Sequence, residues 1–189
     1  MIFLDVETSN ILPDYGSWDM KAMKISYAGV IDSNNQSYDI WEKDMEALRA
    51  LMNNADLIVG YNIFHFDMPV IANYLGEDIH KLPQLDLMVA AQKALGFRPK
   101  LDSLTSATFG EGKIGNGGDA VKYFHSGQLD KLREYCLEDV RLTKKLYDFG
   151  KEKGYIKFYD KSGFAREIKI NWDDGLKQPV QDAGIISMF

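Results

Sequence analysis

An acidic residue occupies a stretch of sequence that otherwise consists of core-forming side chains. The run YNIFHFDMPVI, residues 61–71, is largely aromatic and aliphatic and follows the apolar segment DLIVG, yet it contains Asp67. A carboxylate buried without a partner costs several kcal/mol or gives up its charge. Either Asp67 lies in the first turn of a helix, where the helix dipole favours negative charge, or a positive charge compensates it.

Two more carboxylates lie close together at Asp5 and Glu7, in the segment FLDVET. Residues two apart in a β-strand point to the same face. Both acidic side chains are therefore expected on one face, with Leu4 and Val6 on the other. Like charges at that distance repel unless a cation lies between them. Because the pattern D-x-E is common, it is also compatible with a strand edge that opens to solvent.

A fourth acidic residue, Asp139, lies in the helical segment EYCLEDVRLTKKLY. Tyr135 precedes it by four residues, so the two side chains share one helical face. That face borders an apolar stripe, which includes Cys136 as a small core residue. An acid at the edge of a core is costly without a partner, and the nearby Arg141 and Lys144 are candidates for that role.

The four carboxylates together have a shared explanation. Oxygen ligands drawn from a strand, a helix start and a long helix make a site for hard divalent cations. Two such ions about 4 Å apart hold a phosphodiester, activate water and stabilise the leaving oxygen. The sequence therefore predicts a site for two Mg²⁺ or Mn²⁺ ions, in which a cation compensates the buried charge of Asp67. The predicted ligands are Asp5, Glu7, Asp67 and Asp139.

The elements that must position these residues follow from the hydrophobic period and the turn residues. Strands are expected at residues 1–7, 24–32, 36–42, 56–62 and 82–88, and helices at residues 43–55, 66–74, 89–95, 101–110 and 129–151. The glycine-rich residues 110–118 are expected to form a flexible connection, with a substrate-facing flap as the alternative. A hairpin is expected at residues 155–170. This order predicts an α/β fold with a mixed sheet covered on both faces.

Length and composition are typical of one globular domain over residues 1–189. The chain is 46% hydrophobic, and no apolar run approaches the roughly 18 residues that a membrane span needs. The first residues, MIFLDVET, indicate a strand and not a signal peptide. A single cysteine excludes an internal disulfide and favours a reducing setting. We therefore expect a cytoplasmic protein without membrane contact.

The net charge of −6 does not by itself indicate nucleic-acid binding, but the charges are unevenly distributed. Residues 1–90 contain 5 Lys/Arg and 14 Asp/Glu, whereas residues 91–189 contain 17 and 14. A solvated surface of mixed charge explains this distribution most simply. The alternative is an acidic, cation-binding centre beside a basic face that follows a phosphate backbone.

The acidic motifs, taken together, resemble those of the DEDDy 3′–5′ exonucleases of the ribonuclease H-like superfamily. The resemblance spans residues 1–150, and residues 151–189 form a hairpin and tail outside the family core. The sister subclass has a histidine five residues before the last aspartate, where this chain has Glu134, so the tyrosine subclass is indicated. The three family motifs are matched at Asp5-Val6-Glu7, at Asn62 through Phe66-Asp67, and at Tyr135 through Asp139.

The resemblance implies a role for each motif residue. Asp5 would bridge both metal ions, and Glu7 and Asp139 would complete the shell of the first. Asp67 would hold the second ion, often through water. Tyr135 would orient the attacking water. The resemblance also implies a ribonuclease H-like, five-stranded central sheet in which three antiparallel strands are followed by two parallel ones.

The implied activity is hydrolysis from the 3′ end of single-stranded DNA or RNA, with DNA favoured, releasing nucleoside 5′-monophosphates. A structure-selective endonuclease and a catalytically inactive nucleic-acid-binding module are the alternatives. Asn62, His65 and Phe66 are expected to contact the substrate. Asp86 is expected to give structural support, with a direct role in the site as the alternative. The C-terminal hairpin could contact nucleic acid, cover the core or form a dimer; a monomer is favoured.

Overall fold

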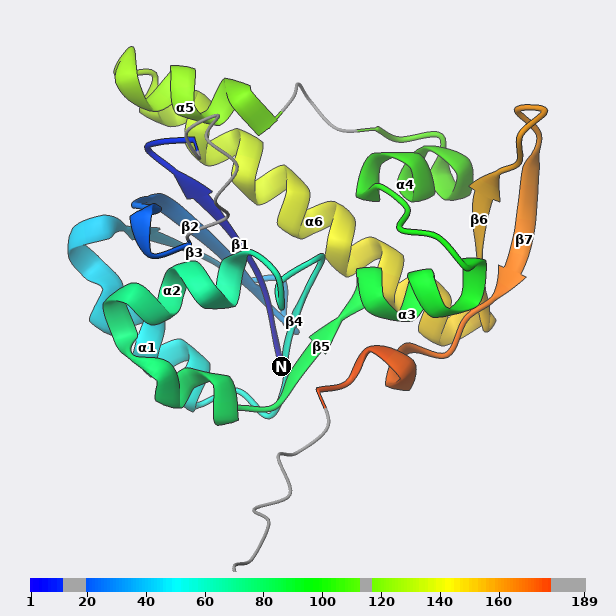
Figure 1. Cartoon of the computed structure of the whole chain (residues 1–189), viewed down its shortest axis with the longest axis horizontal. Helices are drawn as coiled ribbons and strands as arrows, with labels where there is room; N and C mark the ends of the chain where they lie inside the picture. The colour runs from blue at the N-terminus through cyan, green and yellow to red at the C-terminus, as the bar shows by residue number, and fades with distance from the viewer. Residues whose placement is uncertain (12–19, 113–116, 178–189) are drawn as a thin grey trace, which may run out of the picture.

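The centre of the protein is a five-stranded mixed sheet in the order β3-β2-β1-β4-β5 (Figure 1). The computed structural model describes residues 1–11, 20–112 and 117–177. Pairing is antiparallel between β1, β2 and β3 and parallel between β1, β4 and β5, which confirms the predicted arrangement. The strands are β1 (Ile2–Thr8), β2 (Ile25–Asp32), β3 (Ser37–Trp41), β4 (Ile58–Gly60) and β5 (Gln84–Asp86).

Helices cover both faces of this sheet, as predicted. Figure 1 shows α1 and α2 on one side and the long α6 across the other. The α-helices are α1 (Met45–Asn53), α2 (Asp67–Leu75), α3 (Leu87–Leu95), α4 (Leu101–Phe109), α5 (Gly117–His125) and α6 (Leu129–Lys153). Short 3₁₀ helices are η1 (Met20–Ala22), η2 (Glu42–Asp44), η3 (Glu77–Lys81) and η4 (Trp172–Gly175).

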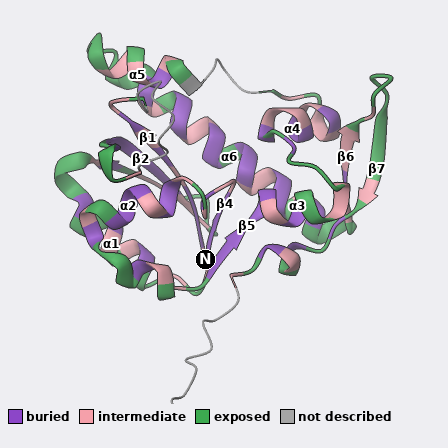
Figure 2. Cartoon of the chain, in the orientation of Figure 1, coloured by how far each residue is buried: buried purple, intermediate pink, exposed green. Residues whose placement is uncertain are grey.

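Strand β1 separates two hydrophobic clusters, and buried residues concentrate along the sheet (Figure 2). Leu4 and Val6 belong to the cluster formed with α1 and α2. Phe3 points the other way and packs edge-on against Tyr147 of α6, with ring centroids 5.5 Å apart. The odd-numbered residues of β1 thus face α6, which places Asp5 on the α6 side, as the alternation predicts.

Helix α6 is the longest element and confirms the predicted apolar stripe. The side chains of Leu132, Cys136, Val140 and Leu146 on this stripe are fully buried. The helix begins at the predicted residue and extends two residues beyond the predicted end. It stops at Gly154, whose φ of +74° favours a residue without a side chain.

Helix α5 is the one α-helix of the described chain that the sequence pattern does not predict. It begins in the glycine-rich segment, whose composition favours a loop over a helix. Residues 113–116 of the predicted flexible connection lie outside the described residues. At the end of α5, His125 Nε2 lies 2.7 Å from the Ser9 carbonyl oxygen, which fixes the helix against the end of β1.

The predicted C-terminal hairpin is confirmed as β6 (Tyr155–Tyr159) and β7 (Ala165–Lys169). It covers the core, because Ile156 and Ile170 join the cluster on the α6 side. After the hairpin, the Trp172 indole donates to the Tyr147 carbonyl at 3.0 Å, and Leu176 pairs with β5. None of the helices in the described part of the chain has the length and hydropathy needed to cross a membrane.

The end of β4 requires a residue without a side chain, because its backbone passes close to β1. A Cβ at Gly60 would lie 2.1 Å from Ile63 Cγ2 and 2.9 Å from the Leu4 carbonyl oxygen. We expect Gly60→Ala to destabilise the protein by about 2 kcal/mol through overpacking. Chemical denaturation measures this change. Gly118→Ala is the matched control, since a Cβ there meets no atom within 4 Å, and its stability should equal or exceed that of the wild type.

Candidate active site

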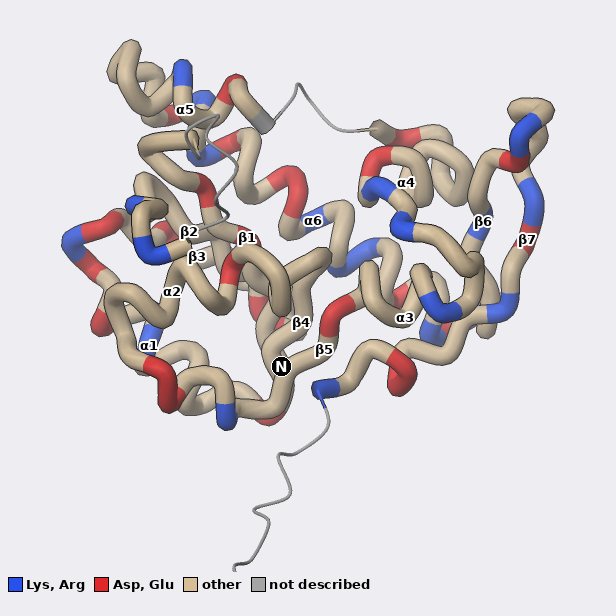
Figure 3. Tube along the Cα trace, viewed as in Figure 1, with Lys and Arg blue, Asp and Glu red and all other residues tan. Residues whose placement is uncertain are grey.

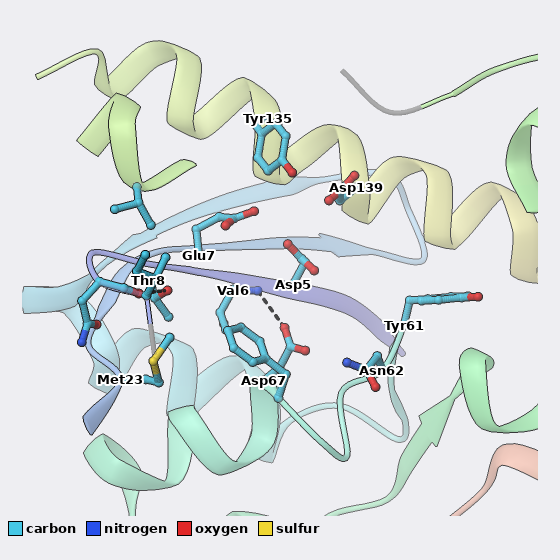
Figure 4. A pocket seen from close by; sticks show the side chains of 14 residues that line it. Asp5, Val6, Glu7, Thr8, Met23, Tyr61, Asn62, Asp67, Tyr135 and Asp139 are labelled. Carbon is cyan, nitrogen blue, oxygen red and sulfur yellow. Dashed lines mark hydrogen bonds between the residues drawn. The ribbon is translucent and has the colours of Figure 1, made fainter. Parts of the chain in front are cut away.

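A pocket of about 420 Å³ opens between β1, the start of α2 and α6. It contains every predicted metal ligand together with Tyr135, drawn from segments far apart in the sequence. Figure 4 shows the carboxylates of Asp5, Glu7 and Asp139 and the Tyr135 hydroxyl around the same space. The predicted site residues that line the pocket are Asp5, Glu7, Asn62, Phe66, Asp67, Tyr135 and Asp139.

Asp5 and Glu7 project from β1 into this pocket beside a buried cysteine. One carboxylate oxygen of each lies within 4.8 Å of the other and of Cys136 Sγ. Burial, reinforced by the charges of Asp5 and Glu7, raises the pKa of the Cys136 thiol well above its usual value. The neutral thiol lies 3.5 Å from Asp5 Oδ2 and 3.4 Å from the Asp5 carbonyl oxygen, so it can donate to Asp5. The cysteine is a core residue, as predicted, and it also fixes a carboxylate.

Asp67 stands in the first turn of α2 and reaches β1. Its Oδ1 accepts from the Val6 N–H at 2.9 Å (Figure 4). Strand β4 pairs with β1 only at Ile2 and Phe3. Beyond Phe3, the Asp67 carboxylate supplies the hydrogen-bond acceptor that a neighbouring strand would otherwise provide. The side chain is buried, and this desolvation, together with the charges of Asp86 and Asp139, raises the pKa of Asp67 to about 7 despite the backbone hydrogen bonds.

Tyr135 and Asp139 are both buried on the side of α6 that faces β1. The cations proposed from sequence as alternative partners of Asp139 form ion pairs with other carboxylates. Arg141 pairs with Glu138 and Glu111, and Lys144 pairs with Asp148 at 2.7 Å. Asp139 instead lines the pocket and contributes to the raised pKa of Asp67. Helix α6 therefore supplies an acid and a hydroxyl to the same space.

The turn between β4 and α2 is held in place by Asp86. The Asp86 carboxylate accepts from the backbone N–H groups of Asn62, Phe64 and Met88 at 2.8, 3.1 and 2.9 Å. Burial raises the pKa of Asp86, and these hydrogen bonds oppose the shift. They also hold Asn62 at a φ of +69°, which non-glycine residues rarely adopt. Asp86 thus gives the structural support expected from sequence.

The three residues expected to contact substrate divide into two groups. Asn62 and Phe66 line the pocket. His65 is exposed and is not among the residues that line the pocket in the described structure. The turn directs Phe66 into the pocket and His65, the residue before it, toward solvent. Adjacency to Phe66 in the sequence was therefore not enough to place His65 in the pocket.

A family model for the RNase_H superfamily matches residues 2–149. The chain belongs to the RNase_H superfamily. The matched region contains the whole pocket and excludes the β6–β7 hairpin. A search of curated proteins finds no match for this superfamily member.

Among solved structures, this RNase_H-superfamily chain is similar to the family B DNA polymerase from the hyperthermophilic archaeon Pyrobaculum calidifontis. The TM-score is 0.60 at 18% sequence identity. The similar region covers 79% of this chain but 24% of the polymerase chain. At this identity the similarity shows a shared fold, and the chain corresponds to about a quarter of the polymerase.

Several pocket residues of this superfamily member were not predicted from sequence. Tyr61 is the clearest, because its hydroxyl donates to the Pro99 carbonyl oxygen at 2.7 Å, and burial raises its pKa. Because Tyr61 precedes Asn62 directly in the sequence, its place in the pocket could have been predicted. Val121 comes from α5, the helix that the pattern did not reveal. The others are Val6, Thr8, Asn10, Ile11 and Met23.

The buried charge of Asp67 should reduce stability at neutral and higher pH when no metal is present. Its pKa is raised from 3.8 to about 7, so this penalty grows as pH rises between those values and persists above them. Asp67→Asn removes the charge and retains an oxygen for the Val6 N–H. In EDTA, we expect this variant to be more stable than the wild type at pH 8, and its advantage there to exceed that at pH 5 by about 2 kcal/mol.

Chemical denaturation at the two pH values measures this difference. Asp56→Asn is the control, because Asp56 is exposed, and its effect should be the same at both pH values. A variant at Asp67 that is less stable than the wild type at pH 8 would show that the carboxylate is compensated within the apo-protein.

Proposed function

We propose that this protein is a metal-dependent 3′–5′ exonuclease of the DEDDy type. It hydrolyses phosphodiester bonds of single-stranded nucleic acid, with DNA favoured, and releases nucleoside 5′-monophosphates. The observation that carries the proposal is the convergence of four carboxylates and one tyrosine in one pocket. Membership of the RNase_H superfamily supports nuclease activity, and the DNA polymerase of similar fold favours DNA over RNA.

The ligand set fits hard divalent cations. The side chains are carboxylates, which suit Mg²⁺ and Mn²⁺, and the cysteine beside them, Cys136, has a thiol kept neutral by its surroundings. Repulsion among the acids and the cost of their burial would both be relieved by positive charge. Asp5, Glu7 and Asp139 would hold one ion, and Asp5 and Asp67 the other. When bound, the ions activate water and stabilise the leaving oxygen.

The remaining residues bind and orient. Tyr135 lies one helical turn from Asp139, and its hydroxyl positions the water that attacks the phosphorus. Asn62 and Phe66 also line the pocket, and an amide and an aromatic ring suit a sugar and a base. The pocket volume of about 420 Å³ falls in the range of small-ligand sites. This size suits one terminal nucleotide better than the middle of a duplex, which favours an exonuclease over an endonuclease.

Digestion of a 5′-labelled single-stranded oligodeoxynucleotide tests this function. With Mg²⁺ or Mn²⁺ we expect a ladder that shortens by single nucleotides from the 3′ end, because only the terminal nucleotide occupies the pocket. EDTA should abolish the ladder, and Asp139→Asn should lower its rate at least 100-fold. One discrete internal product would identify an endonuclease, and cleavage undiminished in EDTA would exclude the metal mechanism.

The role of Tyr135 is tested by removing its hydroxyl alone. Tyr135→Phe keeps the ring in its buried position and leaves the four carboxylates unchanged. We expect kcat to fall by about 10², the lower end of the range for a positioned proton-handling group. KM and the affinity for Mn²⁺ should stay close to wild-type values. Single-turnover cleavage at the wild-type rate would remove Tyr135 from the mechanism while leaving the metal ligands in place.

A further inference from the structure

We propose that the connection between α3 and α4 forms a binding rim for single-stranded nucleic acid, through Phe97, Arg98 and Lys100. The polynucleotide that ends in the pocket passes over this rim, where Phe97 stacks on a base and the two cations contact phosphates. The identity of the ligand rests on the proposed function, whereas the position of the rim rests on the following contacts.

The connection presents an aromatic ring followed by two cations. The side chains of Phe97, Arg98 and Lys100 are exposed, and the Phe97 ring retains 50% of its accessible surface. Pro99 alone is buried and anchors the segment. Exposed aromatic rings beside basic residues bind single strands, because every base has a face that can stack and every nucleotide carries a phosphate.

Two hydrogen bonds attach this rim to the pocket. The Tyr61 hydroxyl donates to the Pro99 carbonyl oxygen at 2.7 Å, and Arg98 donates to Asn62 Oδ1 at 2.7 Å. Tyr61 and Asn62 both line the pocket. Figure 4 shows them at its border, with Tyr61 directed away from the carboxylates. The rim therefore begins where the pocket ends.

The charges of the rim are available for phosphates. Within the described residues, neither Arg98 nor Lys100 forms an ion pair with a carboxylate, and Asn62 is a neutral acceptor. Figure 3 shows Lys and Arg colouring in the connection between α3 and α4. An acidic pocket repels the phosphates that follow the terminal nucleotide. Cations immediately outside the pocket offset that repulsion.

The hairpin supports the aromatic part of the rim. The Phe97 ring contacts Phe158 of β6 edge-on, with centroids 6.5 Å apart. The Lys157 backbone N–H donates to Thr108 Oγ1 of α4 at 3.1 Å, which fixes the hairpin to the helix that follows the rim. Half of the Phe97 surface remains open, so Phe158 holds the ring without covering it. A segment beyond the matched superfamily region thus shapes the approach to the pocket.

The test compares Phe97→Ala and Lys100→Ala with the wild type in two assays. The first is fluorescence anisotropy of a 5′-labelled oligodeoxythymidylate of 20 nucleotides in Ca²⁺. We expect each variant to weaken binding by about 10-fold, and Lys100→Ala to reduce the salt dependence of log Kd by about one. The second is hydrolysis of the 4-nitrophenyl ester of thymidine 5′-monophosphate with Mn²⁺. This ester fits the pocket alone, so its kcat/KM should not change.

Lys43→Ala is the matched control for the cation, because Lys43 is exposed in η2 beside the β3 edge of the sheet. Its oligonucleotide affinity should equal that of the wild type. Unchanged affinity in both rim variants overturns the proposal, as does a parallel loss of ester hydrolysis, which would mean that the pocket itself was disturbed. If the wild type hydrolyses neither substrate, the proposed function fails, and the anisotropy series still decides whether the rim binds single strands.

Discussion

The hydrogen bond from the Val6 N–H to the Asp67 carboxylate joins the two halves of the site. It exists because β4 ends after three residues and leaves the edge of β1 without a strand beside Val6. A buried N–H without a partner is costly, and a side chain from the start of α2 fills that need. The same bond brings a carboxylate to the strand that already carries Asp5 and Glu7. The need of the Val6 N–H for a hydrogen-bond acceptor thus brings together acidic side chains that repel one another.

That repulsion has to be offset by packing elsewhere. The pocket faces α6, whose buried stripe continues past Asp139 into the cluster around Phe3 and Tyr147. Each large apolar side chain buried there contributes about 1.5–3 kcal/mol. On the other face, Leu4 and Val6 join the core under α1 and α2. Apolar side chains thus hold the strand from both faces, and the carboxylates stay together because the packing fixes their backbone.

The parts of this arrangement that are local in sequence could be predicted, and those that depend on distant contacts could not. Strand alternation placed Asp5 and Glu7 on one face of β1, and helical spacing placed Tyr135 beside Asp139. The Arg98–Asn62 and Cys136–Asp5 contacts join residues 36 and 131 positions apart, and no periodicity encodes them. Helix α5 was missed because it begins in a glycine-rich segment, and the exposed position of His65 depends on the turn held by Asp86.

The distribution of charge is a second example, because the composition of a segment does not show where its charges lie in the fold. Most of the excess of lysine and arginine in the second half of the chain does not form a free basic face. Many of those cations are paired with nearby carboxylates, as in Arg133–Asp39, Arg141–Glu138, Lys144–Asp148 and Arg166–Asp160.

Surface pairs of this kind contribute little to stability, but each one cancels a charge that could attract a phosphate. Arg98 and Lys100 differ because they project from a connection that is anchored by Pro99 and bonded to Tyr61 and Asn62. In the proposed rim, the attraction for a polyanion beside the pocket depends on where these two cations lie and not on the charge balance of the whole chain. A protein with a net charge of −6 can for this reason receive a nucleic-acid strand at one border of an acidic site.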